Sequence, residues 1–390
     1  MGVAVEPAGH AIDGMEPRRT VAAASDADVV DVVRAANEQQ EGVVVIGGAT
    51  RLGVGDAPAR YDVALDLRGY RGIVDYEPDD LVATIRAGTT LAELSAALAP
   101  RAQRWPVEAG HHERATVGGI FASAAAGPSR LRYFHPRDWV IGARVVLGDG
   151  TLVRSGGRVV KNVTGYDLTR LWSGTFGTLA VILELTLKLT AAPERTMTLL
   201  GETDVETALV TAAALHAAGL PLDALAVVTG DAVGAVGARG DAALVVRLAG
   251  PTEAVRRLGR AVRERLRSRD VANETWDVIA SLPLDTKWTA RIGWPAALRP
   301  DVGFEGYSAV IYPANGLAFL LRSIDRNAFR RVRSALEAAG GFAVLERASV
   351  AYKRDVGGPW GTGRTPPSIA RELKRRFDPR GVLAPGRMPA

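Results

Sequence analysis

Residues 43–53, VVVIGGATRLG, place a short run of β-branched residues directly before a pair of glycines. A compact apolar run of this kind predicts a buried strand over Val43–Ile46 that stops at a glycine turn. Glycines at such a turn let backbone N–H groups approach a phosphate, and the hydroxyl of Thr50 can add a further donor. The segment matches neither a P-loop nor a GxGxxG dinucleotide fingerprint. Taken alone, it is therefore at least as well explained by an ordinary glycine turn as by a phosphate cradle.

A second glycine-rich segment covers residues 116–128, TVGGIFASAAAGP. Nearly all of its side chains are small, so a flat or bulky group could lie directly against the backbone. A short helix packed tightly on a sheet would have the same composition, and the two interpretations are equally good.

A third segment covers residues 161–179, KNVTGYDLTRLWSGTFGTL. Asp167 is well placed to cap a short helix over residues 168–172, after which the glycines turn the chain into a strand over residues 180–189. As local structure, this segment requires no ligand.

Further elements follow from periodicity and turn chemistry. Ser25 can cap a helix whose apolar residues recur at helical spacing up to Gly42. Gly148-Asp149-Gly150 predicts a hairpin turn, because Asp-Gly tolerates the positive φ that a tight turn needs. Beyond Pro193 we expect helices over 205–218, 254–267 and 326–339, and strands over 242–248, 308–312, 316–321 and 342–347. Two rounds of strand and helix suggest a ferredoxin-like α+β unit.

Length and composition limit the class of protein. A chain of 390 residues, 47% hydrophobic and 23% charged, predicts a globular protein of two domains, or one large domain with a cap. No apolar run reaches the roughly 18 residues that span a bilayer, and residues 11–20 lack a signal-peptide pattern. We therefore expect a cytoplasmic protein. The net charge of +5 is not concentrated in a stripe, so we expect no nucleic-acid partner.

The chain contains no cysteine. This excludes disulfides, cysteine-ligated zinc, a thiol nucleophile and an iron–sulfur cluster held by these residues alone. His111-His112-Glu113 is the one cluster that suggests a metal, but adjacent loop histidines point apart and further ligands are not evident. We expect no metal site, and we interpret this cluster as part of a loop near the edge of a ligand site.

The order and spacing of the three segments, with the Gly-Asp-Gly hairpin between the second and third, resemble the FAD-binding domain of the vanillyl-alcohol oxidase and p-cresol methylhydroxylase (PCMH-type) superfamily. Within it, the chain is similar to the E subunits of bacterial glycolate oxidases (glycolate dehydrogenases). That closer resemblance rests on RGIV (71–74), ATVGG (115–119), AGP (126–128), RD (137–138), KNVTGYDL (161–168) and the closing motif FDPRGVLAPGR (377–387). It is strong up to Pro193, weak in the middle, and strong again in the closing motif.

The resemblance implies an α+β fold: a two-lobed PCMH-type FAD-binding domain (residues 1–195), a small ferredoxin-like α+β cap domain (196–350), and a C-terminal segment returning to the FAD domain (351–390). It implies FAD as the cofactor. Relatives that bind the flavin covalently do so through a histidine beside the first glycine pair, where this chain has Ala49 and Thr50, so the FAD should be non-covalent. The cofactor-binding residues implied are Ile46, Gly47, Gly48, Ala49, Thr50, Arg51, Leu52, Pro106, Thr116, Gly118, Gly119, Ala122, Ser123, Gly127 and Ile182.

One departure from the superfamily bears on catalysis. Members that oxidise 2-hydroxy acids use histidines of their C-terminal half as base or metal ligands, and histidine is the usual general base near neutral pH. The five histidines of this chain are His10, His111, His112, His135 and His216. We name no catalytic residue.

The resemblance predicts a FAD-binding subunit of a complex that oxidises glycolate to glyoxylate. Its expected partners are a catalytic FAD-linked oxidase subunit and an iron–sulfur subunit, with at most peripheral association with the inner face of the cell membrane through those partners. One alternative is a stand-alone FAD-dependent oxidoreductase acting on another alcohol or 2-hydroxy acid, for which Arg291, Tyr307 or Lys353 would have to serve in the cap. A second alternative is a non-enzymatic scaffold that binds no flavin.

Overall fold

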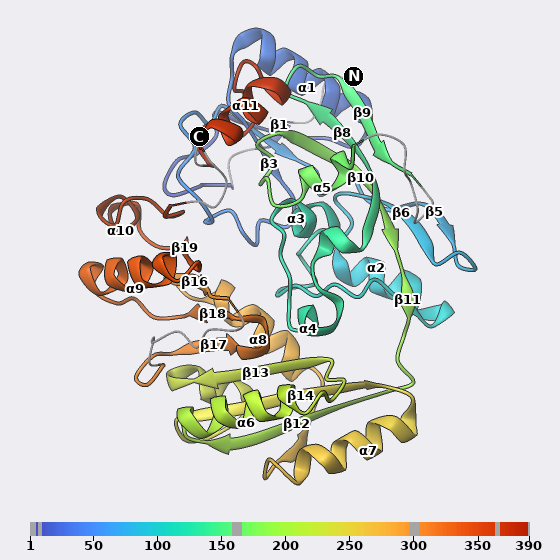
Figure 1. Cartoon of the computed structure of the whole chain (residues 1–390). Coiled ribbons are helices and arrows are strands. Elements are labelled where there is room, and N and C mark those ends of the chain that lie inside the picture. Colours follow the sequence, from blue (N-terminus) through green and yellow to red (C-terminus); the bar gives the residue numbers. More distant parts are fainter. Residues whose placement is uncertain (1–4, 7–9, 158–165, 296–303, 363–366, 389–390) are drawn as a thin grey trace. The chain divides into compact units, whose positions relative to one another are not determined.

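The computed structural model describes residues 5–6, 10–157, 166–295, 304–362 and 367–388 (Figure 1). Its contacts divide the chain into two compact units. Unit 1 comprises Met1–Ala126, His135–Ala192 and Gly363–Ala390, and unit 2 comprises Gly127–Phe134 and Pro193–Thr362. Both units combine helices with β-sheets, so the predicted α+β class is confirmed.

The first lobe of unit 1 is a four-stranded sheet in the order β1-β2-β4-β3. The strands are β1 (Val5–Glu6), β2 (Arg19–Ala22), β3 (Val43–Ile46) and β4 (Val63–Asp66), and β4 pairs in parallel with both β2 and β3. Helix α1 (Asp26–Gln39) packs on this sheet and begins at the predicted cap, where Ser25 and Asp28 form a capping box.

The second lobe of unit 1 is an antiparallel sheet in the order β5-β6-β10-β8-β9. Its strands are β5 (Ile73–Glu77), β6 (Val82–Arg86), β8 (Val140–Leu147), β9 (Leu152–Gly156) and β10 (Ala180–Lys188), and the short strands β7 (Gln103–Arg104) and β11 (Thr190–Ala191) pair beside it. Its helices are α2 (Leu91–Leu98), α3 (Val117–Ala122) and α5 (Leu168–Trp172). Strand β10 joins the two lobes, because Val181 and Leu183 are buried with α1 and the first sheet, whereas Ile182 and Leu185 are buried with α3.

The C-terminal part of unit 1 returns to the first lobe. After α11 (Pro367–Phe377), the chain runs beside β3: the N–H of Val43 donates to Val382 O at 2.8 Å, and the N–H of Ala384 donates to Val43 O at 2.7 Å. Leu383 thereby forms a parallel bridge with Val43. The end of the chain thus completes the sheet that the beginning of the chain starts.

Unit 2 is built on an eight-stranded sheet in the order β15-β12-β14-β13-β17-β18-β16-β19. The first half contains β12 (Arg195–Thr203), α6 (Val205–Ala217), β13 (Ala224–Thr229), β14 (Ala242–Gly250), α7 (Thr252–Arg263) and β15 (Arg269–Val271). The second contains β16 (Thr289–Gly293), β17 (Ala309–Tyr312), β18 (Leu317–Leu320), α9 (Arg326–Ala338) and β19 (Phe342–Arg347). In each half the strand order is fourth, first, third, second, so the ferredoxin-like unit expected from the sequence occurs twice, joined where β13 pairs with β17.

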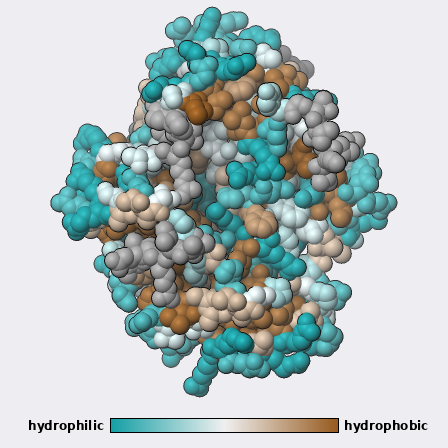
Figure 2. Space-filling view, viewed as in Figure 1, coloured by the Kyte–Doolittle hydropathy of each residue, from teal (hydrophilic) through white to brown (hydrophobic). Residues whose placement is uncertain are grey.

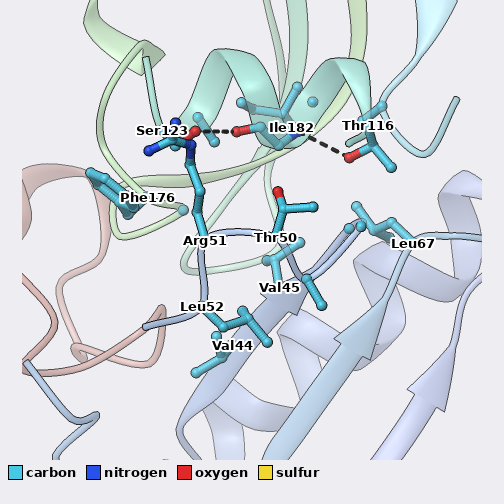
Figure 3. A pocket seen from close by; sticks show the side chains of 18 of the residues that line it. Val44, Val45, Thr50, Arg51, Leu52, Leu67, Thr116, Ser123, Phe176 and Ile182 are labelled. Atoms are coloured by element: carbon cyan, nitrogen blue, oxygen red, sulfur yellow. Dashed lines mark hydrogen bonds between the residues drawn. The ribbon is translucent and has the colours of Figure 1, made fainter. Parts of the chain in front are cut away.

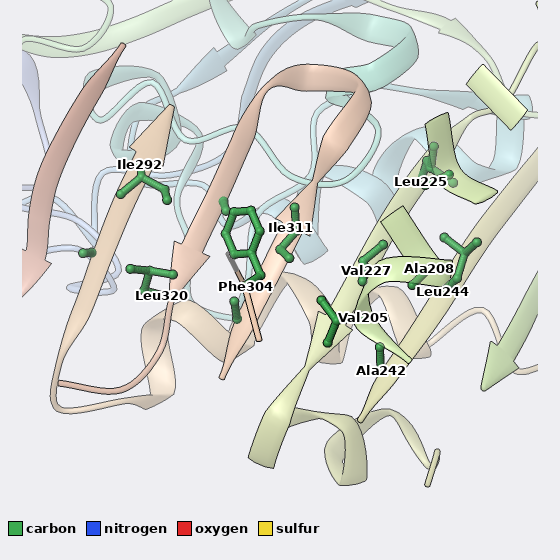
Figure 4. Close-up of a cluster of buried hydrophobic side chains, with 14 of the residues drawn as sticks. Val205, Ala208, Leu225, Val227, Ala242, Leu244, Ile292, Phe304, Ile311 and Leu320 are labelled. Atoms are coloured by element: carbon green, nitrogen blue, oxygen red, sulfur yellow. The ribbon is translucent and has the colours of Figure 1, made fainter. Parts of the chain in front are cut away.

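Two hydrophobic clusters cover the faces of this sheet. Helices α6, α7 and α9 bury one face, the last of them through Phe329. Figure 4 shows Val205 and Leu244 of the same cluster. Helix α8 (Thr275–Asp285) covers part of the other through Trp276 and Ile279. Unit 2 also contains α4 (Arg130–Tyr133) and α10 (Val350–Asp355), and the 3₁₀ helices of the chain are η1 (Ala99–Arg101), η2 (Pro136–Asp138), η3 (Gly230–Val236) and η4 (Pro313–Asn315).

The structure agrees with most of the elements expected from the sequence. Strand β3 has the predicted bounds, the Gly-Asp-Gly hairpin joins β8 to β9, and Asp167 caps α5. Strands β12, β13 and β16 and helix α8 are among the elements that were not predicted. Residues 161–165 of the third segment lie outside the described residues. No helix within the described ranges is long and apolar enough to cross a membrane. On the face shown in Figure 2, hydrophobic residues form separate patches among hydrophilic ones.

Candidate cofactor-binding site

A pocket in unit 1 lies between the loop that follows β3, helix α3 and strand β10 (Figure 3). Its empty volume is about 830 Å³, counting the part open to solvent. Most of the residues predicted to bind the cofactor line it: Gly47, Gly48, Ala49, Thr50, Arg51, Leu52, Thr116, Gly118, Gly119, Ala122, Ser123 and Ile182.

The glycines of the first two segments allow the two loops to touch. A Cβ on Gly48 would lie 1.8 Å from the carbonyl oxygen of Arg114, and a Cβ on Gly47 would lie 2.4 Å from Thr116 Oγ1. A Cβ on Gly118 would lie 2.6 Å from that of Ala87. No side chain fits at these distances, so glycine is required for the close approach that forms the pocket wall.

The loop after β3 presents free hydrogen-bond donors. Within the part of the chain that the structure describes, no backbone or side-chain acceptor takes the N–H groups of residues 47–50. Ala49 has a φ of 55°, which turns the loop so that consecutive N–H groups can form an anion-binding concavity. Buried or half-buried N–H groups are nearly always paired in native proteins, so this loop is suited to a ligand with several acceptor oxygens.

Helix α3 contributes shape rather than free donors. Its cap residue Thr116 accepts the N–H of Gly119 at 3.2 Å, and the N–H groups of Val117 and Gly118 donate to Thr89 O and Ala87 O. The hydroxyl of Ser123 donates to Gly119 O at 2.7 Å (Figure 3). The segment is therefore the short helix that one interpretation predicted, and its small side chains also leave the open wall that the other predicted.

The far wall comes from β10 and the loop before it. Ala180 and Ile182 line the pocket from the strand, together with Phe176 and Gly177, whose φ values of 52° and 71° are positive. The N–H of Phe176 donates to Ala122 O at 2.8 Å, which ties this loop to the end of α3. The wall is mainly apolar, so a flat aromatic group could be buried against it.

The charged groups of the pocket are positive. Its lining includes Arg51 and Arg387 and, among the described residues, no carboxylate. Figure 3 shows the Arg51 side chain extending from its loop on the side of Ser123. Burial lowers the pKa of the Arg387 guanidinium, but an arginine remains charged at neutral pH. Free N–H groups beside two guanidinium groups match a phosphate-bearing ligand.

Three predicted residues do not line the pocket. The side chain of Ile46 is fully buried in the apolar cluster beneath the loop, and Pro106 is buried elsewhere. Gly127 clusters with unit 2. The turn at His111 lies against Gly48 through the carbonyl of Arg114. In this turn, His112 Nε2 lies 3.0 Å from Glu113 Oε1. Within the described ranges, no three His, Cys, Asp or Glu side chains lie together as metal ligands would.

Several lining residues were not predicted. They are Val44, Val45, Leu67, Ala87, Phe176, Gly177 and Arg387. Arg387 ends the closing motif, and Phe176 and Gly177 lie in the third glycine-rich segment. Their place in these motifs could have indicated that they belong to the site. The sequence does not single out the aliphatic residues, because nothing distinguishes them from ordinary core residues.

Comparisons with known proteins give an independent result. A model of the FAD binding domain matches residues 17–156, which contain both glycine segments of the pocket. The glycolate oxidase subunit GlcE of Escherichia coli (strain K12) is 34% identical over 340 residues, covering 83% of this chain and 86% of GlcE. GlcD of Bacillus subtilis (strain 168) is 30% identical over 184 residues, which cover only 39% of GlcD. The structure of p-cresol methylhydroxylase with substrate bound is similar in fold, with a TM-score of 0.71, 18% identity, and 95% of this chain and 88% of that chain covered.

Proposed function

Because this chain belongs to the family of the glycolate oxidase subunit GlcE, whose members are FAD-linked oxidoreductases with a PCMH-type fold, we propose that it is the FAD-binding subunit of a complex that oxidises glycolate to glyoxylate. A partner subunit with its own FAD would oxidise the substrate, and an iron–sulfur subunit would carry the electrons onward. The observation that carries the proposal is the donor-rich pocket of unit 1, in a chain whose match to GlcE covers 86% of the length of GlcE.

The cofactor of this chain is FAD, and we place it in this pocket. The N–H groups of residues 47–50 would hold the diphosphate, with Arg51 providing positive charge beside it. The flavin end would lie along the small side chains of α3 and against Ile182. When bound, FAD would accept the two electrons that are released as an alcohol carbon is oxidised to a carbonyl. The pocket lining contains no histidine among the described residues, in keeping with non-covalent attachment.

The assignment of substrate oxidation to a partner rests on the side chains of this chain. Removing the hydroxyl proton of a hydroxy acid requires a general base, usually a histidine, and no histidine occurs beyond His216. The chain also has no cysteine to hold an iron–sulfur cluster. Electron transfer to a cluster therefore requires a second chain.

The stand-alone alternative depends on groups of unit 2 that are already engaged. Arg291 donates to the buried Glu346 at 2.6 Å, and Lys353 is only 3% exposed. Arg291 is thus engaged in an ion pair and Lys353 is buried, so two of the three groups that this alternative named are already occupied, which favours the subunit role over a substrate site of this chain alone. The scaffold alternative does not account for the free N–H groups of residues 47–50.

The test is to purify the chain alone, record its visible spectrum, and assay glycolate with an artificial electron acceptor. We expect a yellow protein that releases its flavin on acid precipitation, turns over little glycolate by itself, and gains activity when mixed with a longer FAD-linked subunit and an iron–sulfur subunit. Robust turnover by the chain alone would establish the stand-alone alternative. A colourless protein that does not take up added FAD would establish the scaffold.

A further inference from the structure

The last described residues of the chain reach the pocket from far along the sequence. Arg387 is 3% exposed, and its Nη2 donates to Leu52 O at 2.7 Å and to Val54 O at 2.5 Å. These carbonyls belong to the loop whose N–H groups face the pocket. One guanidinium from the C-terminal segment therefore fixes the loop that follows β3.

The backbone around Arg387 is itself held in place. Leu383 bridges Val43 of β3, and the N–H of Ala59 donates to Pro385 O at 2.8 Å. Gly386 has a φ of 80°, and a Cβ on it would lie 3.0 Å from the Cβ of Ala59. The guanidinium is thus delivered by a segment with little freedom, which is what a positioning role requires.

We propose that Arg387 is a positioning residue of the FAD site, and that the C-terminal segment is an integral part of that site. Because a peptide group is planar, holding the carbonyls of Leu52 and Val54 also fixes the N–H groups of Gly53 and Gly55, and so anchors the end of the loop that begins with the donors of residues 47–50. The same guanidinium lines the pocket and adds positive charge beside the place of the diphosphate. The inference rests on FAD occupying this pocket.

The test compares variants of the full chain after removal of its flavin. The dissociation constant for FAD is measured by flavin fluorescence at low and high salt for Arg387→Gln, Arg387→Lys and the wild type. The matched control is Arg380→Gln, since Arg380 lies in the same segment and donates to Asn37 O at 2.9 Å outside the pocket. Riboflavin, which lacks the diphosphate, is the second probe.

We expect Arg387→Gln to weaken FAD binding at least tenfold, to flatten its dependence on salt, and to leave riboflavin binding within about twofold of the wild type. Arg387→Lys keeps a charge and should retain the salt dependence, with an intermediate loss of affinity. Arg380→Gln should bind FAD like the wild type.

Two results would overturn the inference. One is FAD affinity within twofold of the wild type in both Arg387 variants. The other is an equal loss of FAD and riboflavin affinity with unchanged salt dependence, because that pattern reports damage to the fold alone. If Arg387→Gln does not fold, the FAD-to-riboflavin affinity ratio of Arg387→Lys decides between the two readings. Failure of wild-type protein to bind FAD would instead count against the proposed function.

Discussion

The ammonium of Lys374 lies 2.5 Å from Oδ2 of Asp378, one turn further along the chain at the end of α11. Lys374 also donates to Thr178 O at 2.7 Å and to Leu383 O at 2.6 Å, and Asp378 accepts the N–H groups of Val382 and Leu383. Burial lowers the pKa of Lys374, whereas Asp378 opposes that shift. This ion pair therefore connects α11 to Thr178, which lies just before β10, and to the segment around Leu383 that runs beside β3.

Replacing Asp378 with alanine should strongly destabilise unit 1. Asp378 is 1% exposed, so its loss would leave the half-buried Lys374 without its carboxylate and two backbone N–H groups without an acceptor. We expect the loss of this pair to lower the unfolding free energy by about 3–5 kcal/mol. Denaturant titration of the wild type and the variant measures this difference. The control Arg375→Ala, which removes an exposed partner of Glu372 on the same helix, should cost less than about 1 kcal/mol. Equal losses in the two variants would contradict this role of the pair.

The cap of α1 should make stability depend on pH in the acid range. Hydrogen bonds from the N–H groups of Ala24 and Ser25 lower the pKa of the Asp28 carboxyl below its usual value. A depressed carboxyl pKa means that the unfolded chain binds the proton first as the pH falls. The stabilisation is therefore complete well above pH 3.8, the ordinary value, and is lost as the pH falls through the lower folded-state pKa.

The measurement for this prediction is the unfolding free energy of the wild type and Asp28→Asn between pH 6 and pH 2.5. The difference between them should be constant at the upper end and shrink toward zero at the lower end. Ser25→Ala removes the other half of the capping box, and because the Ser25 hydroxyl also helps to lower the pKa of Asp28, part of its effect should fade over the same acid range. A difference between wild type and Asp28→Asn that stays constant down to pH 2.5 would refute the assignment.

Gly48→Ala should abolish FAD binding. The added methyl would lie 1.8 Å from Arg114 O, so the loop after β3 would have to move away from the turn that precedes α3. We expect a protein that is purified without yellow colour and is less stable by about 1–3 kcal/mol or more. Gly234→Ala is the matched control, since a Cβ there meets nothing within 4 Å, and it should retain its flavin. A yellow Gly48→Ala protein would show that the close contact of the loops is dispensable.

In unit 2, a buried ion pair joins the start of β13 to β14. Arg247 Nε donates to Asp223 Oδ2 at 2.6 Å, and Asp223 is fully buried. Asp223→Ala should lower the unfolding free energy by about 3–5 kcal/mol, because it leaves the arginine buried without its carboxylate. Asp231→Ala, whose exposed pairing with Arg322 at 3.4 Å lies in the same unit, should change it by less than about 1 kcal/mol. Thermal unfolding of Asp223→Ala and Asp231→Ala, each compared with the wild type, measures this difference in stability.

The elements that the sequence predicted well are those set by local chemistry. Ser25 and Asp28 cap α1, and Gly148-Asp149-Gly150 turns β8 into β9, because caps and turns depend on neighbours in the sequence. Strand β16 was missed because Arg291 interrupts its apolar run, and α8 was missed because Pro283 lies inside it. Both are stabilised by tertiary partners: β16 pairs with β18 and β19, and α8 packs on the sheet.

The residues of the candidate site likewise fall into those that local motifs predicted and those that only tertiary contacts bring in. The loop after β3 and helix α3 were predicted from contiguous motifs, and the structure places them against each other. The contact of Arg387 with Leu52 joins residues 335 positions apart, so no local pattern could reveal it. Ile46 stays a prediction: its side chain is fully buried in the cluster beneath the loop, so it would reach a ligand only through its backbone.

The C-terminal segment that pairs with Val43 has a consequence for synthesis of the protein. Much of unit 1 leaves the ribosome before unit 2, but residues 374–387 emerge only after the whole of unit 2. Until then β3 has an unpaired edge and the loop before Gly53 lacks the guanidinium that fixes it. A nascent chain therefore carries an open strand edge, which is a site for aggregation and for chaperone binding. With FAD in the proposed site, its loading would be a late event that waits for the sheet beside Val43 to be completed.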